Sequence, residues 1–103
     1  DNTLQPFTTV GNNTIIWSGN HIGHHSAIGD HCFISSHVVI SGSCKVENNV
    51  FIGVNATLHD NISIASETFV GSSSLITKST KEKSVFVTPG TKQFKKNSNK
   101  LRF

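Results

Sequence analysis

Residues 16–40 read IWSGNHIGHHSAIGDHCFISSHVVI, and every sixth residue in this stretch, counted from Ile16, is an isoleucine. The register continues in both directions and reaches back to Leu4. Twelve consecutive positions at this spacing are aliphatic: Val10, Ile16, Ile22, Ile28, Ile34, Ile40, Val46, Ile52, Leu58, Ile64, Val70 and Ile76. An amphipathic helix needs a period near 3.6 and a half-buried strand needs a period of two, so neither explains a period of six. The chain is therefore built from a short repeated unit.

Each unit holds a turn as well as an aliphatic residue. Turn-forming residues separate the aliphatic positions, as in Gly11-Asn12-Asn13 and Glu47-Asn48-Asn49, and such residues tolerate sharp corners. The position four residues after most aliphatic positions is small or compact, with Asn20 and Ile62 as exceptions. Three units make one triangular coil, and coils stack through parallel strands. The sequence predicts an all-β fold, a left-handed parallel β-helix, with about four triangular coils over residues 10–81.

Residues one coil apart share an outward face of such a prism. One face carries an apolar row, here called the phenylalanine ladder: Ile15, Phe33, Phe51 and Phe69. A mixed face carries His21, Val39, Thr57 and Leu75, and a polar face carries Ala27, Lys45 and Ser63. Monomers avoid exposing a stacked apolar patch of this kind. We therefore expect another chain to cover the ladder and part of the mixed face, most simply in a homotrimer; a further domain of the same chain is the alternative.

Size and charge indicate one domain followed by a tail. The 103 residues leave room for a single domain, and we expect it at residues 4–90, with a basic tail at 91–103. The tail has no acidic residue and five basic ones: Lys92, Lys95, Lys96, Lys100 and Arg102. We interpret it as a solvated end, and we expect no nucleic-acid binding because its only aromatic residues are Phe94 and Phe103.

The remaining composition favours a cytoplasmic protein without a membrane span. No apolar run approaches the ~18 residues that a span requires, and the start has no signal-peptide pattern. The sequence begins at Asp1 and contains no Met, so we expect a piece of a longer chain. The two cysteines, Cys32 and Cys44, fall on the compact inward positions, and we interpret them as buried structural residues.

The histidines are the candidate chemical groups. Five of the six lie between residues 21 and 37. His25, His31 and His37 are six residues apart, which places them on three different corners and keeps them from converging on one metal within a chain. A neutral imidazole is a natural base for taking a proton from a hydroxyl or an amine near neutral pH. Among the six, His24 is the candidate base.

With this repeat and these histidines, the chain resembles the bacterial hexapeptide-repeat sugar acyltransferases, especially the sialic-acid O-acetyltransferase and nucleotide-amino-sugar N-acetyltransferase branch. The resemblance covers about residues 4–90 and rests on the repeat, on GHHSAIGD at 23–30 and on VFIGVNA at 50–56. It implies a homotrimer that holds acetyl-coenzyme A between adjacent β-helices, with no metal. Many relatives carry an N-terminal nucleotide-sugar domain, and we expect none in this chain.

The resemblance also implies roles for particular residues. In the family, a His at the position of His24 is the general base, and the acidic residue that usually follows it is replaced here by His25. Coenzyme contacts carry over to Phe33, Val54 and Ser72; position 33 is often His in relatives, so Phe33 implies packing in place of a hydrogen bond. The implied activity is transfer of an acetyl group to a hydroxyl or amine of a sugar or nucleotide sugar.

Two alternatives stay open. A metal-dependent hydratase of the γ-carbonic-anhydrase type resembles this fold and gathers its His ligands between subunits. Its characteristic His pair encloses four residues, and no His pair in this sequence has that spacing. The second alternative is a catalytically inactive β-helix scaffold, which would bind no coenzyme A.

Overall fold

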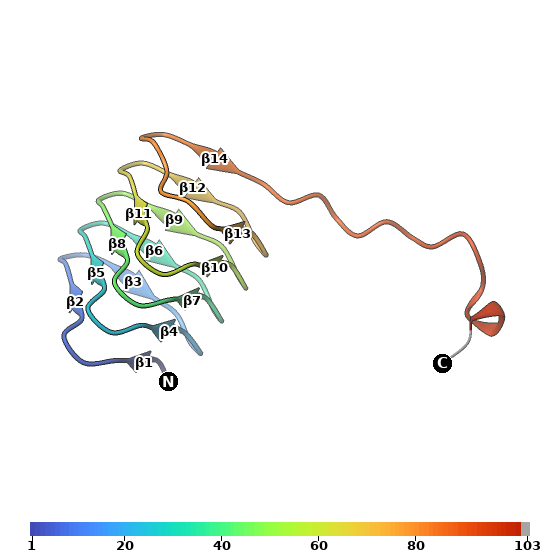
Figure 1. Ribbon diagram of the computed structural model, residues 1–103, viewed down its shortest axis with the longest axis horizontal. Coiled ribbons are helices and arrows are strands. Elements are labelled where there is room, and N and C mark those ends of the chain that lie inside the picture. The colour runs from blue at the N-terminus through green and yellow to red at the C-terminus, as the bar shows by residue number, and fades with distance from the viewer. Residues whose placement is uncertain (102–103) are drawn as a thin grey trace.

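The computed structural model describes residues 1–101, and from the first strand to the last the chain winds as a triangular solenoid of stacked turns (Figure 1). Its strands are two residues each: β1 (Thr3–Leu4), β2 (Thr9–Val10), β3 (Ile15–Ile16), β4 (His21–Ile22), β5 (Ala27–Ile28), β6 (Phe33–Ile34), β7 (Val39–Ile40), β8 (Lys45–Val46), β9 (Phe51–Ile52), β10 (Thr57–Leu58), β11 (Ser63–Ile64), β12 (Phe69–Val70), β13 (Leu75–Ile76) and β14 (Val85–Phe86). The predicted all-β parallel β-helix is confirmed.

The strands form three parallel sheets, one on each side of the prism. The mixed face is the sheet β1-β4-β7-β10-β13, the polar face is β2-β5-β8-β11, and the ladder face is β3-β6-β9-β12-β14. The register places Phe33 beside Phe51 and Phe51 beside Phe69. The three outward faces predicted from the period of six are therefore confirmed.

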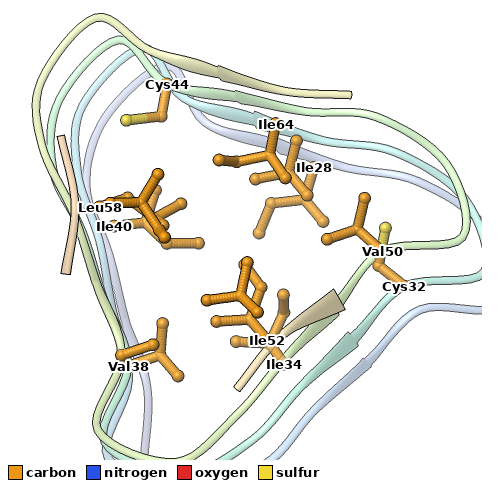
Figure 2. Close-up of a cluster of buried hydrophobic side chains, with 14 of the residues drawn as sticks. Ile28, Cys32, Ile34, Val38, Ile40, Cys44, Val50, Ile52, Leu58 and Ile64 are labelled. Carbon is orange, nitrogen blue, oxygen red and sulfur yellow. The ribbon is translucent and has the colours of Figure 1, made fainter. Parts of the chain in front are cut away.

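The aliphatic positions of the repeat fill the inside of the prism. From Ile22 to Ile76 every one of them is buried, and Figure 2 shows side chains such as Ile34, Ile52 and Leu58 pointing into the space that the three sheets enclose. Removing these side chains from water is the main force that stabilises the coil. Leu4 is 46% exposed because it lies in the first turn, where no preceding coil covers it.

From Asn20 to Ser74 the compact inward positions are also buried, including the two exceptions, Asn20 and Ile62. The side-chain oxygen of Asn20 accepts a hydrogen bond of 2.7 Å from the amide of Val38. Cys32 and Cys44 are free and buried, as expected. Burial raises the pKa of both thiols, because loss of solvent disfavours the thiolate. Both thiols are therefore protonated near neutral pH.

From Phe7 to Ser73 each corner of the coil turns through a residue with positive φ. His25, His31 and His37 have φ values of 60°, 57° and 58°, and they lie after β4, β5 and β6 respectively, on three different corners. This placement is the one expected from their spacing. A positive φ is uncommon for residues other than glycine and asparagine, so the stacked coils must hold these corners in place.

The end of the solenoid departs from the 18-residue coil. Phe69 pairs with Val85, which is 16 residues further along the chain, so the last coil is two residues shorter. No described strand continues the polar face beyond β11; instead, the hydroxyl of Ser79 accepts a hydrogen bond of 2.9 Å from the amide of Ser63. Strands extend from Thr3 to Phe86, about five turns, one more than the sequence predicted.

After β14 the chain runs away from the solenoid as an extended segment with one short helix, Ser98–Lys100 (Figure 1). The four lysines of the predicted basic tail that fall in this segment, Lys92, Lys95, Lys96 and Lys100, are exposed. Arg102 and Phe103 lie outside the described residues. None of the described helical structure is long and apolar enough to cross a membrane.

Candidate functional site

His24 lies on the corner that joins the mixed face to the polar face, between β4 and β5, and its side chain is exposed. Its backbone amide donates a hydrogen bond of 2.9 Å to the side-chain oxygen of Gln5 in the preceding coil. Its ring covers Gly42 in the next coil, where an added Cβ would lie 2.6 Å from Nε2 of His24. A side chain at position 42 would therefore displace the imidazole.

His24 forms a pair with His25. Their Nδ1 atoms are 3.1 Å apart, and the two rings meet edge to face at 85° with centroids 5.3 Å apart. His25 in turn stacks on Phe7 of the preceding coil, with a centroid distance of 4.9 Å and an interplanar angle of 20°. The backbone amide of His25 donates to the carbonyl oxygen of Pro6 over 3.1 Å. The ring and the backbone of His25 are thus both held by the coil beneath.

The only carboxylate in this corner among the described residues belongs to Asp60, which lies one coil beyond Gly42. One of its oxygens accepts a hydrogen bond of 2.9 Å from the amide of Gly42. This corner therefore offers His24 another imidazole as its hydrogen-bond partner in place of an acid. Within residues 1–101 no three His, Cys, Asp or Glu side chains are grouped closely enough to hold a metal ion.

The other candidate residues lie elsewhere on the prism. Phe33 belongs to β6 on the ladder face, whereas Val54 and Ser72 lie on the corner that joins the ladder face to the mixed face. His24 is at the opposite edge of the mixed face. The structure thus brings Val54 and Ser72 together in adjacent coils, and it does not bring them to His24 within one chain.

The phenylalanine ladder is a continuous apolar wall. The rings of Phe33 and Phe51 stack with centroids 5.6 Å apart, and those of Phe51 and Phe69 with centroids 4.8 Å apart. Trp17 meets Phe33 edge to face at 5.1 Å. The wall is open to solvent at its ends, since Ile15 is 49% and Phe69 is 41% exposed, whereas Phe33 and Phe51 between them are half-buried. The predicted alignment of the ladder is confirmed.

The corner between the ladder face and the mixed face is here called the corner beside the ladder. It differs from the other two corners in how its backbone amides are hydrogen-bonded. On the corner between the polar and ladder faces, the Asn48 side chain accepts from the amide of Asp30 over 2.8 Å. The Asp60 side chain does the same for Gly42 on the His24 corner. The equivalent positions beside the ladder are Ser36, Val54 and Ser72, and in the described residues their side chains accept no such bond. The amides of Ser36 and Val54 are therefore left without a side-chain acceptor from the next coil.

Two residues of the His24 corner were not predicted from the sequence. Phe7 precedes His25 by 18 residues and Gly42 follows His24 by 18 residues, so each occupies the same corner position in an adjacent coil. The stacking rule that found the ladder would have found both if it had been applied to the corner positions. It would not have shown that the two His rings face each other.

Comparisons with known proteins agree with the fold. Residues 7–42 match the family model described as bacterial transferase hexapeptide, six repeats, so the predicted hexapeptide repeat is confirmed. A serine acetyltransferase in complex with cysteine is similar, with a TM-score of 0.73 and 20% identity over 89% of this chain and 40% of that chain. PerB from Caulobacter crescentus, in complex with CoA and GDP-perosamine, has a TM-score of 0.55 and 20% identity over 76% of this chain and 46% of that chain.

Serine acetyltransferase isoform 3 from Entamoeba histolytica, in complex with cysteine, has a TM-score of 0.53 and 17% identity over 93% of this chain and 39% of that chain. The present chain therefore spans less than half the length of each of these three structures. At such low identity the likeness shows the fold alone. No curated protein sequence matches the chain.

Proposed function

We propose, on the premise that this chain carries the hexapeptide repeat of bacterial transferases, that it transfers an acetyl group from acetyl-CoA to a hydroxyl or amine of a sugar or nucleotide sugar. The observation that carries the proposal is that the repeat segment matched at residues 7–42 includes His24, exposed at a corner with its Nδ1 paired to His25. The GDP-perosamine bound by PerB supports the choice of a nucleotide sugar.

In this proposal His24 is the general base. The acceptor oxygen or nitrogen attacks the carbonyl carbon of the thioester, the carbon–sulfur bond breaks, and Nε2 of His24 takes the acceptor proton and passes it to the sulfur. Acetyl-CoA supplies the activated acyl group. A neutral, exposed imidazole can bind and release this proton near neutral pH. Placing the two reactants side by side supplies much of the remaining rate enhancement.

We propose further that the site is completed by a neighbouring chain in a homotrimer. His24 lies at one edge of the mixed face, and Phe33, Val54 and Ser72 lie at or beyond the other edge. A cyclic arrangement joins two different surfaces of neighbouring copies, so the ladder side of one chain can face the His24 corner of the next. The exposed ladder supports this contact because monomers avoid such apolar walls.

The coenzyme would then lie along the corner beside the ladder. The amides of Ser36 and Val54 are available as hydrogen-bond donors to carbonyl oxygens of the coenzyme. Phe33 offers an apolar surface for its chain. In this proposal the catalytic domain is residues 4–90, and the exposed tail that follows takes no part in the chemistry.

Calorimetry with coenzyme A, followed by a thiol-release assay with acetyl-CoA, tests the proposal. The expected result is binding of coenzyme A by the folded chain and acetyl transfer to at least one member of a panel of sugars and nucleotide amino sugars. L-serine belongs in the same panel because two similar structures are serine acetyltransferases. A folded chain that binds no coenzyme A is the inactive scaffold, and a chain that acetylates only serine contradicts the sugar acceptor.

A further inference from the structure

We propose that His25 is a positioning residue that fixes the tautomer of His24. Neutral His25 accepts a hydrogen bond at its Nδ1 from the Nδ1–H of His24. The lone pair of His24 is then on Nε2, the atom that faces away from the pair. This inference rests on the proposed function of His24 as the base, and it assigns the role of a tautomer-fixing acceptor to a second imidazole.

The short distance between the two Nδ1 atoms requires that they share one hydrogen. The two Nδ1 atoms are 3.1 Å apart, and at that separation one nitrogen carries a hydrogen and the other offers a lone pair. If His25 were the donor, the hydrogen of neutral His24 would sit on Nε2 and that atom could take no proton. Only the opposite direction leaves His24 able to act as a base at Nε2.

His25 is built into the coil in a way that suits a fixed partner. Its ring stacks on Phe7 at 4.9 Å, and its amide is bonded to the carbonyl of Pro6. Its backbone has the corner φ of 60°, and its ring lies edge to face against that of His24. The stacking and the amide bond both restrict rotation of His25, so its Nδ1 stays within reach of its neighbour.

The groups packed against the pair carry no charge. In the coil below lie Gln5, Pro6 and Phe7; in the coil above lie Gly42 and Ser43. One coil further lie His59 and Asp60, and the carboxylate of Asp60 accepts from the Gly42 amide. Within the described residues, only the other imidazole is therefore positioned to share a proton with His24.

This arrangement makes the base depend on two neutral rings. Protonation of His24 removes the lone pair at Nε2, and protonation of His25 removes the acceptor for the Nδ1–H of His24.

Long-range proton–nitrogen NMR of the nitrogen-15-labelled chain, at a pH where both rings are neutral, tests the proposal. Wild-type His24 is expected in the Nδ1–H form. His25→Ala should remove this preference and lower kcat/KM about tenfold or more, since loss of a tautomer-fixing partner slows other histidine-dependent enzymes strongly. His25→Asn supplies an oxygen acceptor and should restore part of both readouts.

His31 provides the matched control for the backbone. It has a φ of 57° on another corner, and alanine is strained at such angles whereas asparagine tolerates them. His31→Ala and His31→Asn should therefore reproduce any strain effect without changing the His24 tautomer. An Nδ1–H signal that is identical in wild type and His25→Ala would overturn the proposal, as would wild-type His24 in the Nε2–H form. Because the NMR needs no substrate, an inactive chain with the expected tautomers contradicts only the proposed function.

Discussion

Replacing His24 with alanine should lower the turnover number of the proposed acetyl transfer on the order of 10²-fold or more while leaving the fold and the proposed homotrimer intact. The loss follows because His24 is the group that takes the acceptor proton in the proposed mechanism. The fold should tolerate the change because the His24 ring is exposed and its backbone bond to Gln5 remains. Steady-state acetyl-transfer kinetics, with circular dichroism and molar mass measured on the same samples, check the result.

His59 is the matched control for this variant. It lies on the same corner, further along the solenoid, and its side chain is also exposed. His59→Ala removes an imidazole of the same kind from the same edge and should retain near-normal turnover. Near-normal turnover in His24→Ala would take His24 out of the role of base, whatever the control shows.

The second large effect is expected at the centre of the ladder. Phe51→Asp should convert the proposed homotrimer into single folded chains and should abolish the proposed acetyl transfer with it. Phe51 stacks on both Phe33 and Phe69 on the outside of the prism. A carboxylate there would be buried without a partner in the contact between chains, which is costly. Light scattering gives the molar mass, and circular dichroism reports the β-helix.

Ser63→Asp is the matched control for the ladder variant. Ser63 is the outward residue of β11 on the polar face, so the same charge is introduced at an equivalent strand position that no proposed contact covers. Its mass and activity should stay those of the wild type. A Phe51→Asp chain that keeps the wild-type mass would show that the ladder is not the contact surface.

The sequence predicted the solenoid because one period controls several levels of the structure. The same spacing that buries Ile34 and Ile52 inside also aligns Phe33 with Phe51 outside. Side chains one coil apart must then stack, whatever their chemistry. This is why the three faces and the placement of the buried cysteines could be predicted without any knowledge of the individual contacts.

The six-residue period could not predict the short final coil or the contact between His24 and His25. The short final coil depends on Ser79, whose hydroxyl replaces a strand contact for Ser63, and a count of aliphatic positions does not reveal this replacement. The His24 and His25 pair depends on side-chain rotamers and on stacking over Phe7. The period places both histidines on one corner, but it does not determine which of their atoms meet.

The account depends most on a site shared between two chains, and mixing two inactive variants tests that claim directly. One chain carries His24→Ala and the other carries Val54→Asp on the corner beside the ladder; the two are unfolded together, refolded and assayed for acetyl transfer. Each variant alone should be inactive. If the site combines His24 of one chain with Val54 of its neighbour, an equal mixture should recover about a quarter of the wild-type activity, because one contact in four has both intact residues. A mixture that assembles normally and recovers no activity would contradict the account.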